Sequence, residues 1–126
     1  MAGIDYVEVF LDRPRQLRLP AVKVRDMQIG LADNRGIPAS LIEILTRLGG
    51  IDLTAYYVAV RVCLMHDDAK LTLTGAEKLV MAHLKKYGNI TRLNTALAKL
   101  INDTGLISQE QEIETGEDGP GESPAA

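Results

Sequence analysis

Hydrophobic and polar residues alternate near the start of the chain. Apolar side chains recur at every second position, first at Val7, Val9 and Leu11 and then at Leu17 and Leu19. This spacing predicts two strands that each bury one face, and the Asp-Arg-Pro-Arg stretch between them has the composition of a turn. The pattern therefore predicts a β-hairpin that ends at Pro20, because proline cannot donate to a strand ladder.

A helical spacing of apolar residues replaces the alternation after the hairpin. Helices are predicted over residues 21–34, 38–48 and 53–66, then from Thr74 to Gly88 and from Asn89 toward Gly105. The first of these has an apolar stripe of only Val22, Met27 and Leu31. Because two strands alone are marginally stable, the hairpin must rest on these helices or on another chain. The predicted fold class is α+β, mainly α: an N-terminal hairpin followed by four or five short helices.

Capping residues predict where these helices begin. Pro38 suits the first turn of the second helix, because the N–H that proline lacks has no partner there. Asp52 is a predicted N-cap for the third helix. Thr74 and Glu77 form a predicted capping box for the fourth helix, after an extended segment over residues 71–74.

The predicted helix over residues 53–66 is apolar on most of its circumference. Such a helix lies at the centre of a fold or faces a partner. We expect this helix and the helix over 38–48 to expose apolar faces for binding, with four anchors: Leu45, Leu48, Tyr56 and Tyr57. Aromatic anchors dominate many interfaces because they bury a large area at a low entropic cost. For each of the four, a place in the core is the alternative interpretation.

Charge divides the chain into two parts. The 126 residues carry a net charge of −3, and residues 108–126 hold six acidic residues and no Lys or Arg. Removing those six negative charges leaves residues 1–107 at +3. We expect residues 1–107 to form a single domain with an aliphatic core. Residues 108–126, rich in Glu, Gly and Pro, are expected to form a disordered acidic tail.

Residues with catalytic chemistry do not group into a recognisable motif. The single cysteine, Cys63, falls inside an apolar run and is expected to be a buried thiol. His66, Asp67 and Asp68 have metal-ligand side chains, but their spacing to His83 matches no metal motif. We therefore expect no enzyme activity, no metal and no cofactor. With no signal peptide and no long apolar run, we expect a cytoplasmic location and no membrane partner.

A dense basic stretch marks the predicted hairpin. Arg13 and Arg15 cluster at its tip, and Arg18 points away from the apolar face. The favoured interpretation is a solvated face or the rim of a site for an acidic or helical partner. A small DNA-binding or regulatory protein is the alternative. It is less favoured, because aromatic residues for base stacking are missing.

The order of these parts resembles that of a known protein family. A strand pair ending in RQLRLP precedes a helix, then GIPASLIEILTRLGG, IDLTAYYVAVRVCL and LTLTGAEKLVMAHL, and a final short helix. In this order the chain is similar to the small tail assembly chaperones of long-tailed bacteriophages, in the branch shared with gene transfer agents. The likeness covers residues 6–107 and rests on element order and pattern.

The resemblance implies a binding protein rather than an enzyme. It implies that the chain binds the long, helical tape measure protein, keeps it soluble, and helps to recruit the tail tube protein. It further implies a homo-oligomer that acts in the host cytoplasm and is absent from the mature virion. A structural tail or connector subunit that stays in the particle is the other interpretation.

Overall fold

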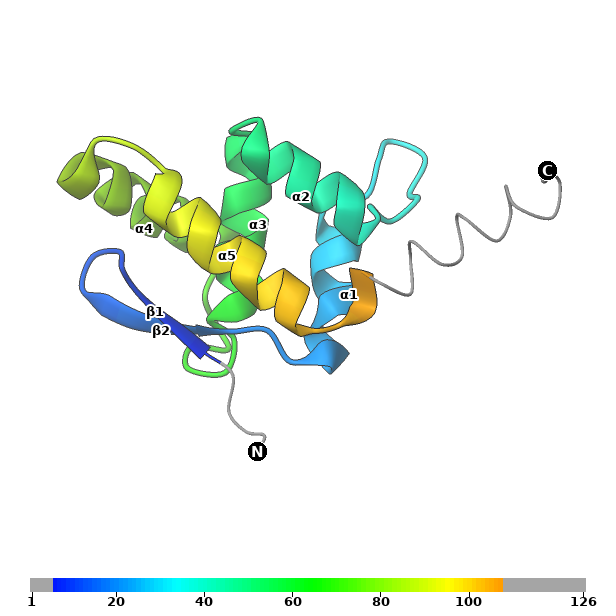
Figure 1. The fold of residues 1–126 in the computed structure, drawn as a ribbon, viewed down its shortest axis with the longest axis horizontal. Helices are drawn as coiled ribbons and strands as arrows, with labels where there is room; N and C mark the ends of the chain where they lie inside the picture. The colour runs from blue at the N-terminus through cyan, green and yellow to red at the C-terminus, as the bar shows by residue number, and fades with distance from the viewer. Residues whose placement is uncertain (1–5, 108–126) are drawn as a thin grey trace, which may run out of the picture.

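The computed structural model describes residues 6–107 of the chain. The predicted disordered tail over 108–126 lies outside the described residues. Within them, an N-terminal two-stranded hairpin precedes five helices (Figure 1). The predicted fold class, α+β and mainly α with an N-terminal hairpin, is confirmed.

The hairpin consists of two antiparallel strands, β1 (Tyr6–Phe10) and β2 (Pro14–Arg18). Val7 lies opposite Leu17, and the apolar face predicted from the alternation is turned inward, with Leu11 and Leu17 fully buried. Pro14, predicted in the turn, is instead the first residue of β2. Proline is tolerated at that position because it interrupts no central ladder.

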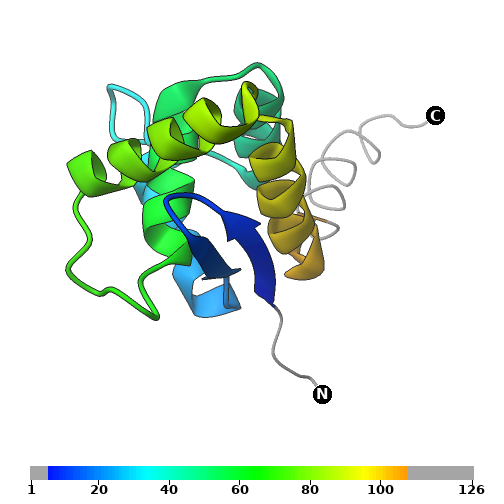
Figure 2. The same ribbon diagram turned by 90° about the vertical axis from the view of Figure 1, so that its left-hand side faces the viewer.

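Five helices follow the hairpin: α1 (Ala21–Gly30), α2 (Leu41–Gly49), α3 (Leu53–Cys63), α4 (Leu73–Tyr87) and α5 (Thr91–Asp103). α3 is central and contacts α1, α2, α4 and β2, while α5 packs against β1 and α2. Figure 2 shows β1 beside α5 and β2 on the side of α3. Seven of the eleven residues of α3 are buried, which explains why its sequence is apolar on most sides.

The first two helices are shorter than predicted. α1 ends at Gly30, four residues before the predicted end. The reason is the Asp33 carboxylate, which accepts the backbone N–H groups of Arg35 and Ile37 and so stabilises a loop. α2 begins three residues after the predicted start, because the Ser40 hydroxyl caps it by accepting a first-turn N–H at 3.0 Å.

The predicted capping box of Thr74 and Glu77 is wrong. The N-cap of α4 is Thr72, whose hydroxyl accepts the N–H of Gly75 at 3.0 Å. The segment predicted to be extended therefore supplies the cap and the first turn of the helix. The Leu71 side chain lies over Gly75 in this first turn, where a Cβ atom would come within 2.8 Å of it.

At the junction between α4 and α5, the predicted end of α4 at Gly88 is confirmed, but α5 begins at Thr91, with Ile90 rather than the predicted Asn89 at its N-cap. Gly88 ends α4 with a left-handed φ of 79°, a conformation that glycine adopts without strain. The Asn89 side chain then accepts the N–H of Thr91 at 3.1 Å and so satisfies a first-turn donor of α5. The apolar stripe of α5, which includes Leu93 and Leu97, is buried as predicted.

Asp52 joins the end of α2 to the start of α3. Its carboxylate accepts the N–H of Thr54 at 3.1 Å, as predicted for an N-cap, and accepts a hydrogen bond from Arg47 at 2.7 Å. The hydrogen bond from Arg47 lowers the pKa of Asp52 below its usual value. A carboxyl group with a lowered folded-state pKa stabilises the fold above its unfolded pKa. That stability is lost as the pH falls through the folded-state value.

We expect Asp52→Asn to lower the free energy of unfolding at neutral pH by about 0.5 to 1 kcal/mol, because asparagine keeps the cap and loses only a solvent-screened ion pair. Near pH 3, which lies below the usual Asp pKa of about 3.9, the difference from wild type should shrink, because the Asp52 carboxyl of the unfolded wild-type chain is then largely protonated. Urea denaturation at both pH values measures the two differences. Asp26→Asn, at an exposed pair with Lys23, is the control. A difference that does not change with pH would contradict the role of the Asp52 charge.

Candidate binding groove

Two of the four predicted apolar anchors lie inside the core. Tyr56 and Leu48 are fully buried, and the Tyr56 hydroxyl donates to the Leu48 carbonyl oxygen at 2.7 Å. The expectation that these two side chains are exposed is therefore wrong, because α3 is enclosed by its neighbours. Leu45 and Tyr57 are half-buried and pack against the same core.

The three predicted arginines occupy different environments along the hairpin. Arg13 is exposed at the tip, as expected. Arg15 is half-buried and donates two hydrogen bonds to the Asp12 carboxylate, at 2.9 and 3.0 Å. Arg18 is also half-buried, and its Nε atom has no hydrogen-bond partner among residues 6–107.

The same arginines line a polar hollow of about 420 Å³. Carboxylates line it as well. Glu8 and Asp67 lie in its lining, and Asp12 is paired to Arg15 at its edge. The His66 ring is hydrogen-bonded through Nε2 to the Gln16 carbonyl oxygen at 2.8 Å. These carboxylates offset the arginines, so the hollow lacks the excess of positive charge that phosphate binding uses.

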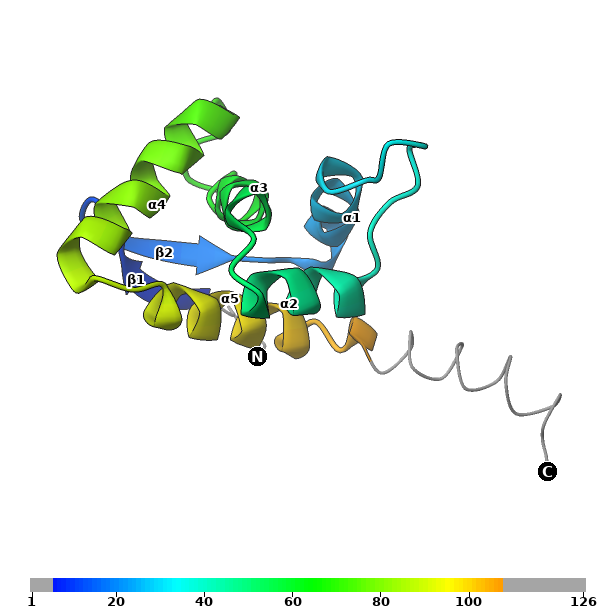
Figure 3. The same ribbon diagram turned by 90° about the horizontal axis from the view of Figure 1, so that it is seen from above.

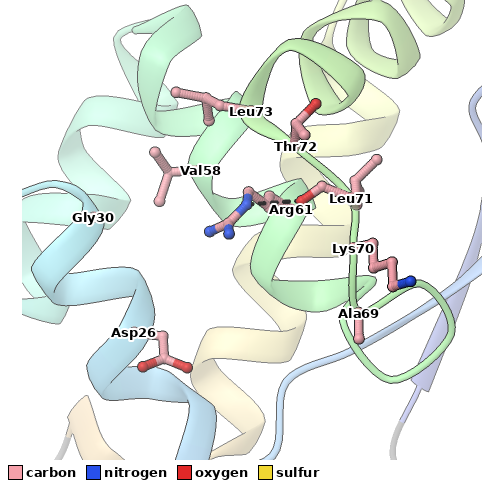
Figure 4. Close-up of a pocket in the computed structure, with 9 residues that line it drawn as sticks. All are labelled: Asp26, Gly30, Val58, Arg61, Ala69, Lys70, Leu71, Thr72 and Leu73. Atoms are coloured by element: carbon pink, nitrogen blue, oxygen red, sulfur yellow. Dashed lines mark hydrogen bonds between the residues drawn. The ribbon is translucent and has the colours of Figure 1, made fainter.

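A second hollow of about 490 Å³ lies between α1, α3 and the start of α4, and we call it the α1–α4 groove. Its lining residues are Asp26, Gly30, Val58, Arg61, Ala69, Lys70, Leu71, Thr72 and Leu73. In Figure 4, α1 forms one side, the segment that leads into α4 forms the other, and α3 lies between them. Figure 3 shows the same order of helices from above.

Beside the groove, α1 exposes apolar residues that are not part of its lining. Val22 and Ile29 lie four and three residues from Asp26, so all three share one helix face. Their side chains are 81% and 53% exposed. Val22 was expected in the buried stripe of this helix, and that expectation is wrong, because Val24 and Met27 form the buried face.

The opposite wall exposes apolar residues of α4. Leu73 and Met81 are 45% and 39% exposed, and with Glu77 between them they follow the four-residue spacing of one helix face. On α3, Tyr57 lies four residues before Arg61 and therefore faces the groove side. Burial and the nearby charge of Glu77 raise the pKa of Tyr57, which agrees with a position between α3 and α4. Tyr57 is thus the one predicted aromatic anchor on the groove side.

Two contacts fix the shape of the groove. At Gly30, α1 comes so close to α3 that a Cβ atom would lie 2.8 Å from Cγ1 of Val58. On the other side, Nε of Arg61 donates to the Leu71 carbonyl oxygen at 2.9 Å and fastens the segment before α4 to α3. The rest of the Arg61 guanidinium extends into the groove in Figure 4. The groove is therefore held open by fixed backbone positions.

The chemistry of the groove suits binding. It offers apolar side chains on α3 and on the segment that leads into α4, two cations at Arg61 and Lys70, and one carboxylate at Asp26. Cys63 lies elsewhere in the core, and burial raises the pKa of its thiol to about 12, so it is not a nucleophile at neutral pH. Residues 6–107 contain no cluster of three potential metal ligands, and no helix among them is long and apolar enough to cross a membrane.

Sequence patterns missed most residues of this groove, although one signal was present. Val22 and Ile29 are apolar but lie off the stripe of the buried residues of α1, and such misplaced apolar residues mark an exposed face. Arg61 and Leu73 carried no comparable signal. In comparisons with known proteins, no family model, curated protein or solved structure matches the chain.

Proposed function

We propose that this chain is a tail assembly chaperone of a long-tailed bacteriophage or gene transfer agent, and that it binds an amphipathic helix of the tape measure protein in the α1–α4 groove. The observation that carries the proposal is the exposure of Leu73 in the lining of the groove, together with Val22 and Ile29, which are exposed on the helix face of Asp26 beside it. The order of elements, which resembles that family, supports the choice of partner.

The dimensions of the groove favour a helical partner. α1 and α4 both pack on α3 but make no extensive contact with each other. Helices pack about 8–10 Å from their neighbours, and in the proposed complex one added helix rests over α3 and against α1 and α4. Its apolar stripe would cover Val58 and Leu73, in the helix-in-groove mode of peptide recognition.

The charges of the groove favour a partner helix that carries acidic residues. Arg61 and Lys70 outnumber the single carboxylate, Asp26. A partner helix with acidic residues beside its apolar stripe would pair with these cations, and such pairs favour correct orientation more than affinity. The proposed partner segment is therefore an acidic, amphipathic helix of the tape measure protein.

The proposal includes the other expected properties of a chaperone of this kind. These are recruitment of the tail tube protein, self-association, and action in the host cytoplasm without incorporation into the virion. The DNA-binding alternative gains no support from the hairpin, because Asp12, Glu8 and Asp67 offset its arginines. A structural tail subunit remains as the competing interpretation.

We expect Leu73→Glu to weaken binding of a tape measure fragment by about 10- to 100-fold, because it removes an apolar contact and sets a charge against an apolar surface. The variant should fold normally, since glutamate in the first turn of a helix interacts favourably with the helix dipole. The measurement is the dissociation constant of the fragment, together with the amount of fragment kept soluble during co-expression.

Ile37→Glu is the matched control for this experiment. Ile37 is 51% exposed in the loop between α1 and α2 and does not line the groove. It should bind the fragment as the wild type does. If Leu73→Glu retains the same affinity as Ile37→Glu, the groove is not the binding site.

Mass spectrometry of purified particles separates the chaperone from the structural subunit. A chaperone is released before assembly ends, so we expect no peptides of this chain beside abundant tube protein peptides. Stoichiometric amounts of the chain in the particles would instead establish a structural subunit and reject the chaperone.

A further inference from the structure

A third hollow lies along the outer edge of the hairpin. It has a volume of about 270 Å³ and lies between β1 and α5, and we call it the β1–α5 groove. β1 belongs to a sheet of two strands and pairs only with β2, so the other side of its backbone has no strand partner among residues 6–107. An unpaired strand edge of this kind is a template for an added strand.

Phe10 shows which backbone groups of β1 face outward. Its carbonyl oxygen accepts a hydrogen bond from Nδ1 of His83 at 2.6 Å, so this group points away from β2. Alternate residues of an antiparallel strand direct their N–H and C=O groups to the same side. The backbone groups of Glu8 therefore also point outward, and Glu8 lines the groove. The free edge thus presents a donor and an acceptor to an incoming strand.

Cations border this groove and are held in place by aromatic rings. Nζ of Lys86 lies 4.4 Å from the centre of the Phe10 ring, and Cζ of Arg92 lies 4.3 Å from the centre of the Tyr87 ring. Neither cation forms an ion pair with a carboxylate of residues 6–107. Cations stacked on rings in this way keep their charge available to an anionic ligand.

The chain contains a segment with the complementary charge. Residues 108–126, which directly follow Ile107, carry six acidic residues and no basic residue. Glu110, Glu112 and Glu114 alternate along this segment, so an extended backbone places all three on one face. That face would lie opposite the cations if the segment were added to β1.

The end of α5 is close enough for this arrangement. Lys99, a lining residue of the groove, lies one helical turn before the last residue of α5, a distance of about 6 Å. Gly105 then adopts a left-handed φ of 77°, which turns the chain after the helix. Leu106 and Ile107 then pack against the core, and the three residue steps from Ile107 to Glu110 span up to about 10 Å when extended, which sets the reach of the segment toward this end of the groove.

We propose that residues 110–115 bind in the β1–α5 groove of the same chain as a third strand beside β1, with their glutamates toward Lys86 and Arg92. The tether supplies an effective concentration of about 1 mM, so weak contacts suffice. The bound segment covers the edge of β1 and prevents its pairing with a second copy. This site is separate from the α1–α4 groove and does not depend on the proposed chaperone function.

Paramagnetic relaxation in the full-length chain tests the proposal. A nitroxide is attached at Thr115→Cys, and the native Cys63 is not labelled because it is fully buried and its thiol pKa is raised. We expect amide signals of residues 6–10 and 92–99 to lose at least about half of their intensity. The signals should recover near 1 M salt, where the Debye length is about 3 Å.

Charge reversal supplies the second arm of the test. The double variant Lys86→Glu and Arg92→Glu should abolish the broadening, whereas Arg25→Glu, an exposed cation of α1, should preserve it. Broadening that is absent from β1, or that persists unchanged in the double variant and in high salt, overturns the proposal. A mixed sample of nitroxide-labelled molecules and isotope-labelled molecules reports contacts between two copies. Broadening that arises only in this mixed sample also overturns the proposal, because the segment would then occupy the groove of another molecule.

Discussion

Replacement of Tyr56 by alanine is expected to lower the free energy of unfolding by about 3 to 5 kcal/mol, the usual cost of removing a large aromatic side chain from a core. The ring is fully buried in α3, and its hydroxyl donates to the Leu48 carbonyl oxygen at the end of α2. A domain of this size has a stability of about 5–15 kcal/mol, so the loss is a large part of the total. Urea denaturation followed by circular dichroism measures it.

Two further variants separate the contributions of Tyr56. Tyr56→Phe removes only the hydrogen bond and should cost about 1 kcal/mol, because the Leu48 carbonyl oxygen keeps the N–H of Ile51 at 3.1 Å. Tyr57→Ala, at the half-buried neighbour, should cost clearly less than Tyr56→Ala. If Tyr56→Ala unfolds at the wild-type urea concentration but loses partner binding, Tyr56 is a surface anchor and its buried position is wrong.

His83→Ala is expected to lower the free energy of unfolding by about 2 to 4 kcal/mol, from a lost buried hydrogen bond and a cavity. His83 is the one buried polar side chain among residues 6–107. Its Nδ1 atom donates to the Phe10 carbonyl oxygen at 2.6 Å. The centres of the His83 and Tyr87 rings lie 4.9 Å apart. Removing the imidazole leaves the Phe10 carbonyl group without that donor and detaches the hairpin from α4.

The hydrogen bond and the volume of His83 can be separated experimentally. His83→Phe restores most of the volume and should still cost about 1 to 3 kcal/mol, because an acceptor loses its donor. Met81→Ala, at an exposed position of the same helix, should change stability by less than about 1 kcal/mol. Nitrogen NMR should find the proton on Nδ1, since a carbonyl oxygen can only accept. Equal stability of His83→Phe and wild type would show that this hydrogen bond contributes nothing.

Sequence patterns predicted the elements of this fold well because each has a strong local signal. The alternation from Val7 to Leu19 required a hairpin, and Gly88 and Asn89 marked the junction of the last two helices. Helix starts were less accurate where two candidate caps lay close together. Thr74 was predicted as the cap of α4, but the hydroxyl of Thr72, two residues earlier, accepts the N–H of Gly75 instead.

The candidate site was harder to predict, because a pattern shows that a face is apolar without showing what covers it. Tyr56 and Leu48 belong to apolar faces that other helices of the chain enclose. Val22, which was predicted in an irregular stripe with Met27 and Leu31, is exposed, and so is Ile29, which the predicted stripe did not include. The burial of His83 had a detectable signal, since it lies four residues after Leu79 and three after Val80 on the buried face of α4.

The link between Phe10 and His83 also governs how the polypeptide can mature on the ribosome. Its two ends are separated by 73 positions, so this support for the first strands forms only when nearly the whole domain has been synthesised. An isolated pair of strands is marginally stable in water. The nascent hairpin therefore gains its full set of contacts only after α4 and α5 have emerged from the exit tunnel.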